Sequence, residues 1–254
     1  KQIGMEIFSS KDENKDDKEI LDTSIKIIKK FGFKTATVKI GNFKLFELLI
    51  KKISIPQRWK SRLLKFYWNE KYFSELLKRL QSNSDIDPIV VAGDKKNYLK
   101  MKKENPNKII AGRSYREIIE RYERKINDPR TVETGKYSVK IIREFLKIKC
   151  SLKDAPKKLN TFYKKYNLNI SVGKDFFPIS NLKQKGINFE FSTSNGRGKD
   201  VEYYSSFIFS IEVRFKNSIK TLVAGGRYND LTSKILGLKK IPAVGAAINL
   251  WVKK

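Results

Sequence analysis

The last third of the chain contains four stretches whose apolar pattern is typical of β-strands. Residues 187–193, 201–215 and 219–224 alternate or run apolar, and residues 243–250 are almost entirely small or apolar. Alternating residues share one face of a strand, so an alternating stretch predicts a half-buried strand. A continuous apolar run predicts a strand that is covered on both faces. A chain with four such stretches close together is constrained to build its core around a sheet.

The N-terminal part of the chain predicts helices that cover this sheet. Residues 17–30 place isoleucine and leucine side chains on one helical stripe, and Gly32 ends that helix. Residues 35–40 alternate apolar with polar side chains, which predicts a strand, and residues 43–52 predict a second helix. Antiparallel strands with helices packed against them give an α+β fold. We therefore predict an antiparallel sheet that is flanked by helices.

The middle of the chain has a different pattern from its two ends. It carries helical periodicity, interrupted by two short apolar stretches at residues 88–93 and 109–114. This change of pattern predicts a core with an insertion. The core comprises residues 1–52 and 151–254, and residues 53–150 form a mainly helical insertion with a connecting helix.

Three large aromatic residues lie on the apolar side of the insertion: Trp59, Tyr67 and Trp68. They are candidates for a binding surface, but large aromatic side chains at helical spacing more often pack inside a domain. We therefore predict that they form the core of the insertion. Ser114 and Glu117 have the spacing of a capping box, so we also predict that a helix begins directly after Ser114.

The chain is strongly basic, with 55 Lys and Arg residues against 27 Asp and Glu residues and a net charge of +28. Such a charge raises nucleic acid as a partner. However, only twelve of the basic residues are arginine, and the lysines are spread over every segment. Base recognition prefers arginine, and dispersed lysine supports only salt-sensitive contact with phosphates. The charge therefore favours a solvated surface over a nucleic-acid groove.

Residue usage also limits the compartment and the chemistry. The single cysteine, Cys150, cannot form an internal disulfide, and no apolar run is long enough to cross a bilayer. We therefore expect a cytoplasmic protein without a membrane partner. There is no histidine and no carboxylate cluster at ligand spacing, so we predict neither a metal site nor a cofactor. Because the sequence begins at Lys1 and has no leader pattern, we expect it to start inside a longer protein.

Three motifs follow one another in the C-terminal part: the pair Tyr203-Tyr204, an Ala-Gly-Gly-Arg-Tyr run at residues 224–228, and a glycine- and alanine-rich strand at residues 243–248. Class II histidyl-tRNA synthetases carry a tyrosine pair, an Ala-Gly-Gly-Arg-Tyr-Asp loop and a glycine-rich terminal strand in this order. The chain resembles that family, and the set of motifs is more specific than any single one. The resemblance implies a class II aminoacyl-tRNA synthetase-like α+β fold, with an antiparallel sheet flanked by helices and a helical insertion.

The opening residues 2–6 resemble the strand that follows the family's second class-defining motif. The resemblance then implies a histidine-like ligand pocket formed by Gln2, Glu6, Lys199, Tyr203, Tyr204, Arg227 and Tyr228. The residue types suit such a ligand, because an ammonium group needs an acceptor and an imidazole ring needs donors and acceptors around it. Neighbours on a strand point to opposite faces, so only one tyrosine of the pair is certain to reach the pocket.

The same comparison implies that the adenylation chemistry is lost. Lys199 stands four residues before the tyrosine pair, where the family has an arginine, and lysine lacks the planar fork that grips a phosphate. The terminal motif of the family closes with Glu-Arg, whereas this chain reads Leu250-Trp251-Val252. We expect the first class motif to lie upstream of Lys1 and expect no anticodon-binding domain after Lys254. These features indicate a noncatalytic paralogue.

Two further stretches, residues 41–59 and 112–118, resemble the regulatory subunit of short-form ATP phosphoribosyltransferase. This resemblance implies a subunit that performs no chemistry itself and assembles with a separate short catalytic subunit. It also implies self-association, activation of the partner in the first step of L-histidine biosynthesis, and a part in feedback by histidine.

Two alternatives remain open at this point. The chain is a fragment of a genuine histidyl-tRNA synthetase if the complete gene product catalyses histidine-dependent pyrophosphate exchange. It is a lysine-rich RNA-binding module without enzymatic activity if it binds RNA with an affinity that falls steeply with salt.

Overall fold

The chain folds into two compact units, the first comprising residues 1–52 and 143–254 and the second residues 53–142. The computed structural model describes residues 2–9, 11–103, 109–110, 112–173, 176–177, 179, 184–198, 203–237 and 239–249. The sequence pattern placed the end of the insertion at residue 150, whereas the second unit ends at Ile142. Helix α7 (Val132–Leu146) begins in the second unit, and its last residues belong to the first.

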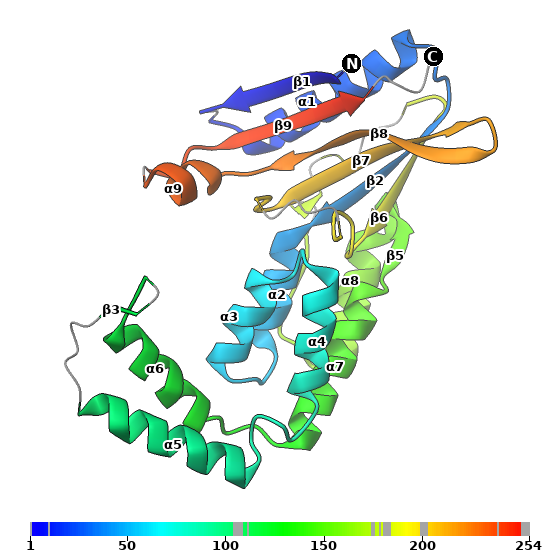
Figure 1. Ribbon diagram of the computed structural model, residues 1–254. Helices are drawn as coiled ribbons and strands as arrows, with labels where there is room; N and C mark the ends of the chain where they lie inside the picture. Colours follow the sequence, from blue (N-terminus) through cyan, green and yellow to red (C-terminus); the bar gives the residue numbers. More distant parts are fainter. Residues whose placement is uncertain are drawn as a thin grey trace. The chain divides into compact units, whose positions relative to one another are not determined.

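The first unit is built on a seven-stranded sheet of described strands with the order β1-β9-β8-β7-β2-β6-β5 (Figure 1). The strands are β1 (Gln2–Phe8), β2 (Ala36–Asn42), β5 (Lys149–Ser151), β6 (Ile187–Ser192), β7 (Phe207–Phe215), β8 (Ser218–Arg227) and β9 (Ala243–Asn249). All neighbouring pairs are antiparallel except β2 and β6, which run parallel. The predicted α+β sheet is therefore confirmed, with one parallel pair that the sequence did not indicate.

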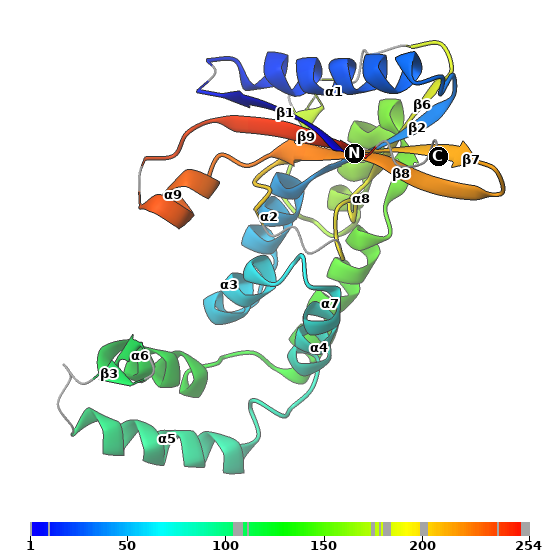
Figure 2. The same cartoon turned by 45° about the horizontal axis from the view of Figure 1, so that its top comes forward.

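Helix α1 (Glu13–Lys30) lies along one face of this sheet (Figure 2). It packs across β1, β9, β8 and β7. The helix begins after Asp12, whose side chain accepts from the backbone N–H of Lys15, and its apolar stripe is fully buried at Leu21, Ile25 and Ile28. Gly32 has a positive φ of 87° and donates to the carbonyl of Lys29, so the predicted glycine stop is confirmed.

Helices α2 (Phe43–Lys52) and α8 (Ala155–Lys165) form an aromatic cluster with the last turn of α7. The unit also contains the 3-10 turn η1 (Leu152–Asp154) and the short helix α9 (Leu231–Leu236). The ring of Phe145, in the last turn of α7, lies 6.1 Å from Phe46 of α2 and 5.8 Å from Phe162 of α8. Aromatic pairs at these separations add favourable packing to the area that they bury. The bounds of α2 match those predicted from the sequence.

The second unit is helical, as its periodicity predicts. It contains α3 (Gln57–Lys65), α4 (Glu70–Leu80), α5 (Pro88–Lys102), a hairpin of β3 (Ile109–Ile110) with β4 (Arg113–Ser114), α6 (Tyr115–Ile126) and the start of α7. Trp59, Tyr67 and Trp68 are buried, which confirms that they pack the core of this unit. The capping box of Ser114 with Glu117 is also confirmed.

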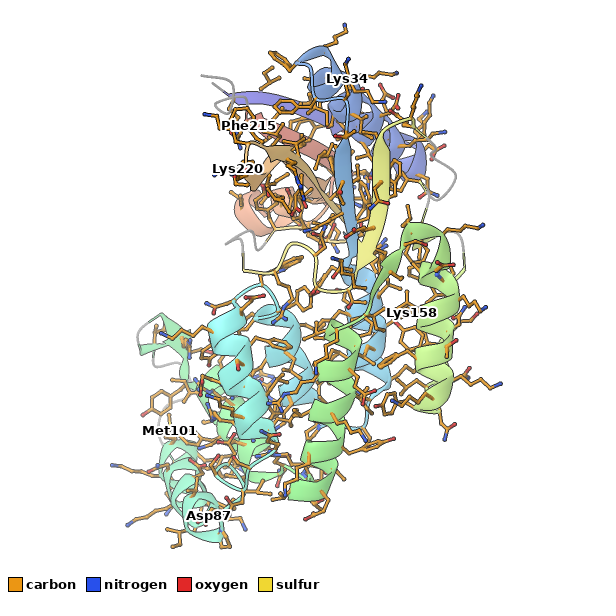
Figure 3. The ribbon with its side chains drawn as sticks, turned by 90° about the vertical axis from the view of Figure 1, so that its right-hand side faces the viewer. Lys34, Asp87, Met101, Lys158, Phe215 and Lys220 are labelled. Atoms are coloured by element: carbon orange, nitrogen blue, oxygen red, sulfur yellow. The ribbon has the colours of Figure 1, made fainter. Side chains whose placement is uncertain are left out.

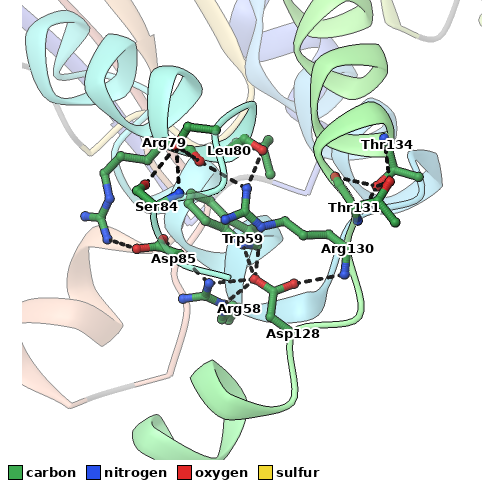
Figure 4. Close-up of polar contacts among 11 residues, drawn as sticks. Arg58, Trp59, Arg79, Leu80, Ser84, Asp85, Asp128, Arg130, Thr131 and Thr134 are labelled. Carbon is green, nitrogen blue, oxygen red and sulfur yellow. Dashed lines mark hydrogen bonds and ion pairs between the residues drawn. The ribbon is translucent and has the colours of Figure 1, made fainter. Parts of the chain in front are cut away.

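An ion-pair cluster holds the helices of the second unit together (Figure 4). Asp128, which follows α6, accepts from Arg58 at 2.6 Å, from the Trp59 indole N–H at 2.9 Å and from Arg130 at 3.1 Å. The guanidinium groups of Arg58 and Arg130 lie 4.9 and 4.7 Å from the Trp59 ring centroid. Asp85 accepts from Arg79 at 2.7 Å. Buried carboxylates with several donors of this kind fix their neighbours in one arrangement.

The structure corrects several predicted elements. Residues 88–93 do not interrupt the helical pattern, because they form the first turns of α5, where Asp87 caps the helix ahead of Pro88. The strand predicted for residues 201–215 begins only at Phe207. The pattern predicts that the third strand ends at Gly225-Gly226, but β8 continues to Arg227. The sequence predicts a tight turn at Asn217-Ser218 between the last two of these strands, whereas the turn consists of Lys216-Asn217, one residue earlier.

Lysine side chains of the first unit lie on many elements. Figure 3 labels Lys34 in the loop before β2, Lys158 on α8 and Lys220 on β8. This distribution agrees with a charge that is dispersed over the surface. Within the described residues, no helix is both long enough and apolar enough to span a membrane.

Candidate ligand-binding site

The predicted ligand residues of β1 and β8 are brought together by the strand register. Glu6 of β1 lies opposite Gly245 of β9, and Gly245 lies opposite Gly226 of β8. Residues that face each other across neighbouring strands share one face of a sheet. Gln2, four residues before Glu6 on β1, and Tyr228, directly after β8, follow the same alternation. The site is thus one face of the sheet near its β1 edge.

Gly226 and Gly245 leave space on this face of the sheet for the side chains of Tyr204 and Glu6. A Cβ atom at Gly245 would collide with the carboxylate of Glu6. A Cβ atom at Gly226 would lie 2.8 Å from the ring of Tyr204 and 2.6 Å from the carbonyl oxygen of Phe207. Glycine is therefore required at position 226, where a Cβ atom would meet the backbone, whereas a Cβ atom at position 245 would displace the carboxylate of Glu6 from the site.

Glu6 provides the acceptor of the site. Its carboxylate accepts a hydrogen bond from the hydroxyl of Tyr228, whose side chain is buried. Glu6 is exposed at the edge of the sheet, yet its neighbours displace enough water to raise its pKa above the ordinary value of 4.5, because desolvation disfavours the charged carboxylate. In its ionised form this carboxylate can attract an ammonium group or accept from a ring N–H.

Aromatic rings surround this acceptor. The ring centroid of Tyr203 lies 4.8 Å from that of Tyr204 and 5.7 Å from that of Tyr228. Phe8 adds an edge-on contact to Tyr228, with centroids 6.3 Å apart. A cluster of tyrosines beside a carboxylate suits a ligand that carries a positive charge or a polar ring, because the ring faces attract cations and the hydroxyls supply hydrogen bonds.

Both members of the tyrosine pair belong to this cluster. The prediction that only one is certain to reach the site assumed that they lie on a strand. In the structure Tyr203 and Tyr204 precede β7 and have no strand conformation, so the alternation of strands does not separate them. Burial is the main cause that raises the pKa of Tyr204, with a further contribution from Tyr203, so its hydroxyl stays protonated and able to donate.

Arg227 has a different environment from the other predicted ligand residues. Its side chain is 1% exposed and turns to the opposite face of the sheet, where α1 lies. It donates to Asp17 at 2.9 Å, to the backbone carbonyl of Glu13 at 2.8 Å and to Asn229 at 3.3 Å. These contacts hold the start of α1 against β8. The guanidinium is therefore committed to the fold rather than to the tyrosine cluster.

Ser210 of β7 is a candidate that sequence reasoning missed. It lies opposite Ala224 of β8, which in turn lies opposite Ala247 of β9, on the same face as Gly226. Its side chain is 2% exposed, and its hydroxyl has no hydrogen-bond partner among the described residues. A buried hydroxyl without a partner is costly unless a ligand or water satisfies it. The only sequence signal is a single serine within the apolar stretch 207–213.

The remaining predicted positions are less constrained. The side chain of Gln2 is exposed on the face of Glu6, opposite Asn249 of β9. Lys199 lies outside the described residues, as do residues 250–252. No group of three or more described His, Cys, Asp or Glu residues is arranged to hold a metal ion.

Comparisons with known proteins were made against families, curated sequences and solved structures. No protein-family model matches the chain. It is 28% identical over 232 residues to the ATP phosphoribosyltransferase regulatory subunit of Allorhizobium ampelinum, a match that covers 86% of this chain and 61% of that relative. It is 26% identical over 270 residues to the corresponding subunit of Rhizobium rhizogenes, covering 100% of this chain and 71% of that relative. The predicted resemblance to these subunits is confirmed.

The fold has a solved counterpart in the histidyl-tRNA synthetase of Nostoc sp. PCC 7120. The TM-score is 0.53 and the identity 16%, with 99% of this chain and 48% of that chain covered. This likeness concerns the fold and confirms the predicted class II synthetase-like architecture. The chain spans about 61% of the length of the Allorhizobium relative.

Proposed function

We propose that the chain is part of a regulatory subunit of ATP phosphoribosyltransferase, which activates a separate short catalytic subunit in the first step of L-histidine biosynthesis. The observation that carries this proposal is the match to two curated subunits of that name, over 86% and 100% of the chain. The protein then works in the cytoplasm, as a hetero-oligomer with the catalytic subunit and with self-association of its own.

The sheet face with the tyrosine cluster is the proposed histidine site. Glu6 is positioned to accept from the ligand's ammonium group or from its ring, and Tyr203 and Tyr204 supply hydroxyls and ring faces beside it. Ser210 offers a buried hydroxyl on the same face. We include Gln2 and Lys199 as further walls of the pocket and leave out Arg227, whose donors are occupied by the start of α1 and by Asn229.

A noncatalytic role agrees with the charges of this face. Adenylation requires cations fixed against the phosphates so that the charge developing in the transition state is stabilised. Among the described residues, the arginine nearest the tyrosine cluster in sequence is Arg227, and it points to the opposite face of the sheet. We therefore propose that the site binds an amino acid without activating it.

Regulation in this proposal is a coupling between two binding equilibria. Binding of histidine and binding of the catalytic subunit are linked by a coupling free energy of ~1–3 kcal/mol, which corresponds to roughly a 5- to 150-fold change in affinity. Linkage requires that the catalytic subunit changes the affinity for histidine by the same factor.

The experiment uses the polypeptide of the complete gene together with the short catalytic subunit of the same organism. We expect the two to co-elute, and phosphoribosyl transfer to ATP to rise when they are mixed and to fall again when histidine is added. Unchanged transfer together with separate elution would show that the proposal is wrong.

The synthetase fragment remains the alternative, and the same polypeptide tests it. Histidine-dependent pyrophosphate exchange by the complete gene product, without any effect on phosphoribosyl transfer, would favour a genuine histidyl-tRNA synthetase over the regulatory subunit.

A further inference from the structure

Helices α5 and α6 of the second unit form an antiparallel hairpin joined through the β3–β4 turn (Figure 1). Asp87 and Met101, labelled in Figure 3, mark the two ends of α5. Large apolar side chains of this hairpin face solvent: Ile89 is 83% exposed, Leu99 58% and Ile109 72%. No other segment of the described chain carries three such side chains so close together in the sequence.

The α5 helix of this hairpin buries little apolar surface. A helix of this length normally turns one apolar stripe toward a core. The one described residue that α5 buries is Asp94, which forms an ion pair with Lys125 of α6 at 2.5 Å. An ion pair of this kind fixes how the two helices meet but contributes little apolar burial. The exposed apolar side chains of α5 therefore take no part in packing the hairpin. Exposed apolar side chains of this kind are typical of a surface that a partner covers.

The same hairpin is basic. Its exposed cations in α5 and directly after it are Lys95, Lys96, Lys100, Lys102 and Lys103, against the single buried acid Asp94. Helix α6 carries glutamates beside its arginines, and Arg116 and Arg124 share Glu120, so most of the positive charge of the hairpin comes from α5. Exposed apolar side chains that share a helix with lysines are complementary to a surface that offers both apolar and acidic groups.

We propose that the α5–α6 hairpin is a docking surface for a partner protein whose contact surface offers both apolar and acidic groups. This inference rests on the proposed function and identifies that partner as the catalytic subunit. Two other occupants fit the surface less well. A second copy of this chain would bring its own net charge of +28 against these lysines. Nucleic acid would neutralise the lysines, but phosphates gain nothing from Ile89 and Leu99.

The test compares two double variants of the full chain. Ile89→Gln with Leu99→Gln removes two apolar contacts and keeps good helix formers in α5. Ile219→Gln with Ile235→Gln is the matched control, because these side chains are 65% and 68% exposed and lie on β8 and α9 in the first unit. A third variant, Lys95→Glu with Lys96→Glu and Lys100→Glu, tests the charge complementarity. Circular dichroism and urea unfolding establish that each variant keeps its helices.

The readout is the Kd for the catalytic subunit, measured by calorimetric titration, and its activation. We expect the Ile89/Leu99 variant to bind at least about tenfold more weakly, as for buried apolar anchors of an interface, and the control to bind like the wild type. The lysine variant weakens binding most at low salt. Activation follows the loss of binding.

Failure of the inference and failure of the proposed function give different results. If the wild type binds and activates the catalytic subunit and both hairpin variants do the same, the docking surface is wrong and the regulatory role stands. If the wild type neither binds nor activates the catalytic subunit, the regulatory role is wrong, and the proposed docking surface is wrong as well. Loss of self-association or of RNA binding alone in the hairpin variants also overturns the inference.

Discussion

At the scale of single residues, the candidate site depends on Glu6 and on the space left for it. The carboxylate reaches Tyr228 only because Gly245 has no side chain beneath it. The tyrosine pair then closes over the neighbouring Gly226. The site therefore combines one carboxylate, two glycines and three tyrosine rings from four separate segments. We expect a substitution at Glu6, in its centre, to change the affinity for the ligand.

We predict that Glu6→Gln weakens histidine binding roughly ten- to hundredfold, because it removes a charge-assisted interaction of about 1.5–3 kcal/mol. Calorimetric titration of histidine against the wild type and the variant measures this. Tyr228→Phe is the matched control, because it keeps the ring and removes only the hydroxyl that donates to Glu6, so we expect a smaller loss. Equal affinity in all three proteins would exclude Glu6 from the ligand site.

The pH dependence of binding follows from the pKa of Glu6. Burial raises that pKa above 4.5, so as the pH falls the carboxyl becomes neutral earlier than an exposed glutamate and stops attracting the ligand's ammonium group. As the pH is lowered, we therefore expect the affinity of the wild type for histidine to begin to fall before pH 4.5 is reached. Glu6→Gln removes this component and leaves only the titration of histidine itself, so identical pH profiles in the two proteins would contradict the assignment.

Asp17 gives a pH prediction for stability. Burial raises its pKa from 3.8 to about 6, although the contact with Arg227 opposes the shift. The folded state thus holds a proton that the unfolded state releases, and this contribution to stability is complete below pH 4 and lost as the pH rises through 6. In Asp17→Asn the contribution is absent. Urea unfolding from pH 4 to 7 should find the wild type losing up to about 3 kcal/mol relative to the variant, whereas a constant difference would refute the shift.

At the scale of elements, close approach between helices decides where glycine is needed. Gly135 in α7 lies against α4, and a Cβ atom there would meet the backbone carbonyl of Leu80. The same carbonyl accepts from Arg130, two residues before α7 begins. The start of α7 therefore packs closely against the end of α4. Arg130 donates a hydrogen bond there, and Gly135 has no side chain that would keep the two helices apart.

Two glycine-to-alanine changes in helices are predicted to have opposite effects. Gly93→Ala in α5 meets nothing within 4 Å, so we expect it to stabilise the protein by about 0.5–1 kcal/mol through the higher helix propensity of alanine. Gly135→Ala forces a backbone carbonyl aside and should destabilise by about 1–3 kcal/mol. Urea unfolding of the second unit's signal measures both. Changes of the same sign would contradict the close approach of α7 to α4.

Local patterns were sufficient to predict several elements. The bounds of α2, the capping box at Ser114 and the burial of Trp59 all follow from residues within a few positions of one another. The rings at Tyr203 and Tyr204 were identified for the same reason, because their motif is contiguous. Each of these predictions needed only propensity, capping chemistry or a short motif.

Contacts that depend on strand register could not be predicted from the sequence. The hydrogen bond from Tyr228 to Glu6 joins residues 222 positions apart, and it exists because β9 lies between β1 and β8. The direction of Arg227 depends on β8 continuing past its glycine pair, which places that side chain on the face of α1. The open hydroxyl of Ser210 likewise follows from pairing with β8. One-dimensional patterns carry no information about which strands pair or in which register.

At the scale of the whole molecule, the net charge of +28 governs encounters more than structure. The described lysines lie on elements of both units, from Lys34 before β2 to the lysines of α5. A field of this kind attracts any acidic partner from a distance, whichever surface finally docks. The docking surface and the overall charge are thus expected to act on different steps of association.

Stopped-flow association with the catalytic subunit separates these steps. We predict that the association rate falls about tenfold between low and physiological salt, because screening shortens the reach of the dispersed lysines, while the dissociation rate changes much less. Charge reversal at Lys95, Lys96 and Lys100 should raise the dissociation rate and keep most of the salt slope, because the remaining lysines still steer the encounter. Loss of the entire slope in that variant would mean that the hairpin alone attracts the partner and that the dispersed charge has no part in recognition.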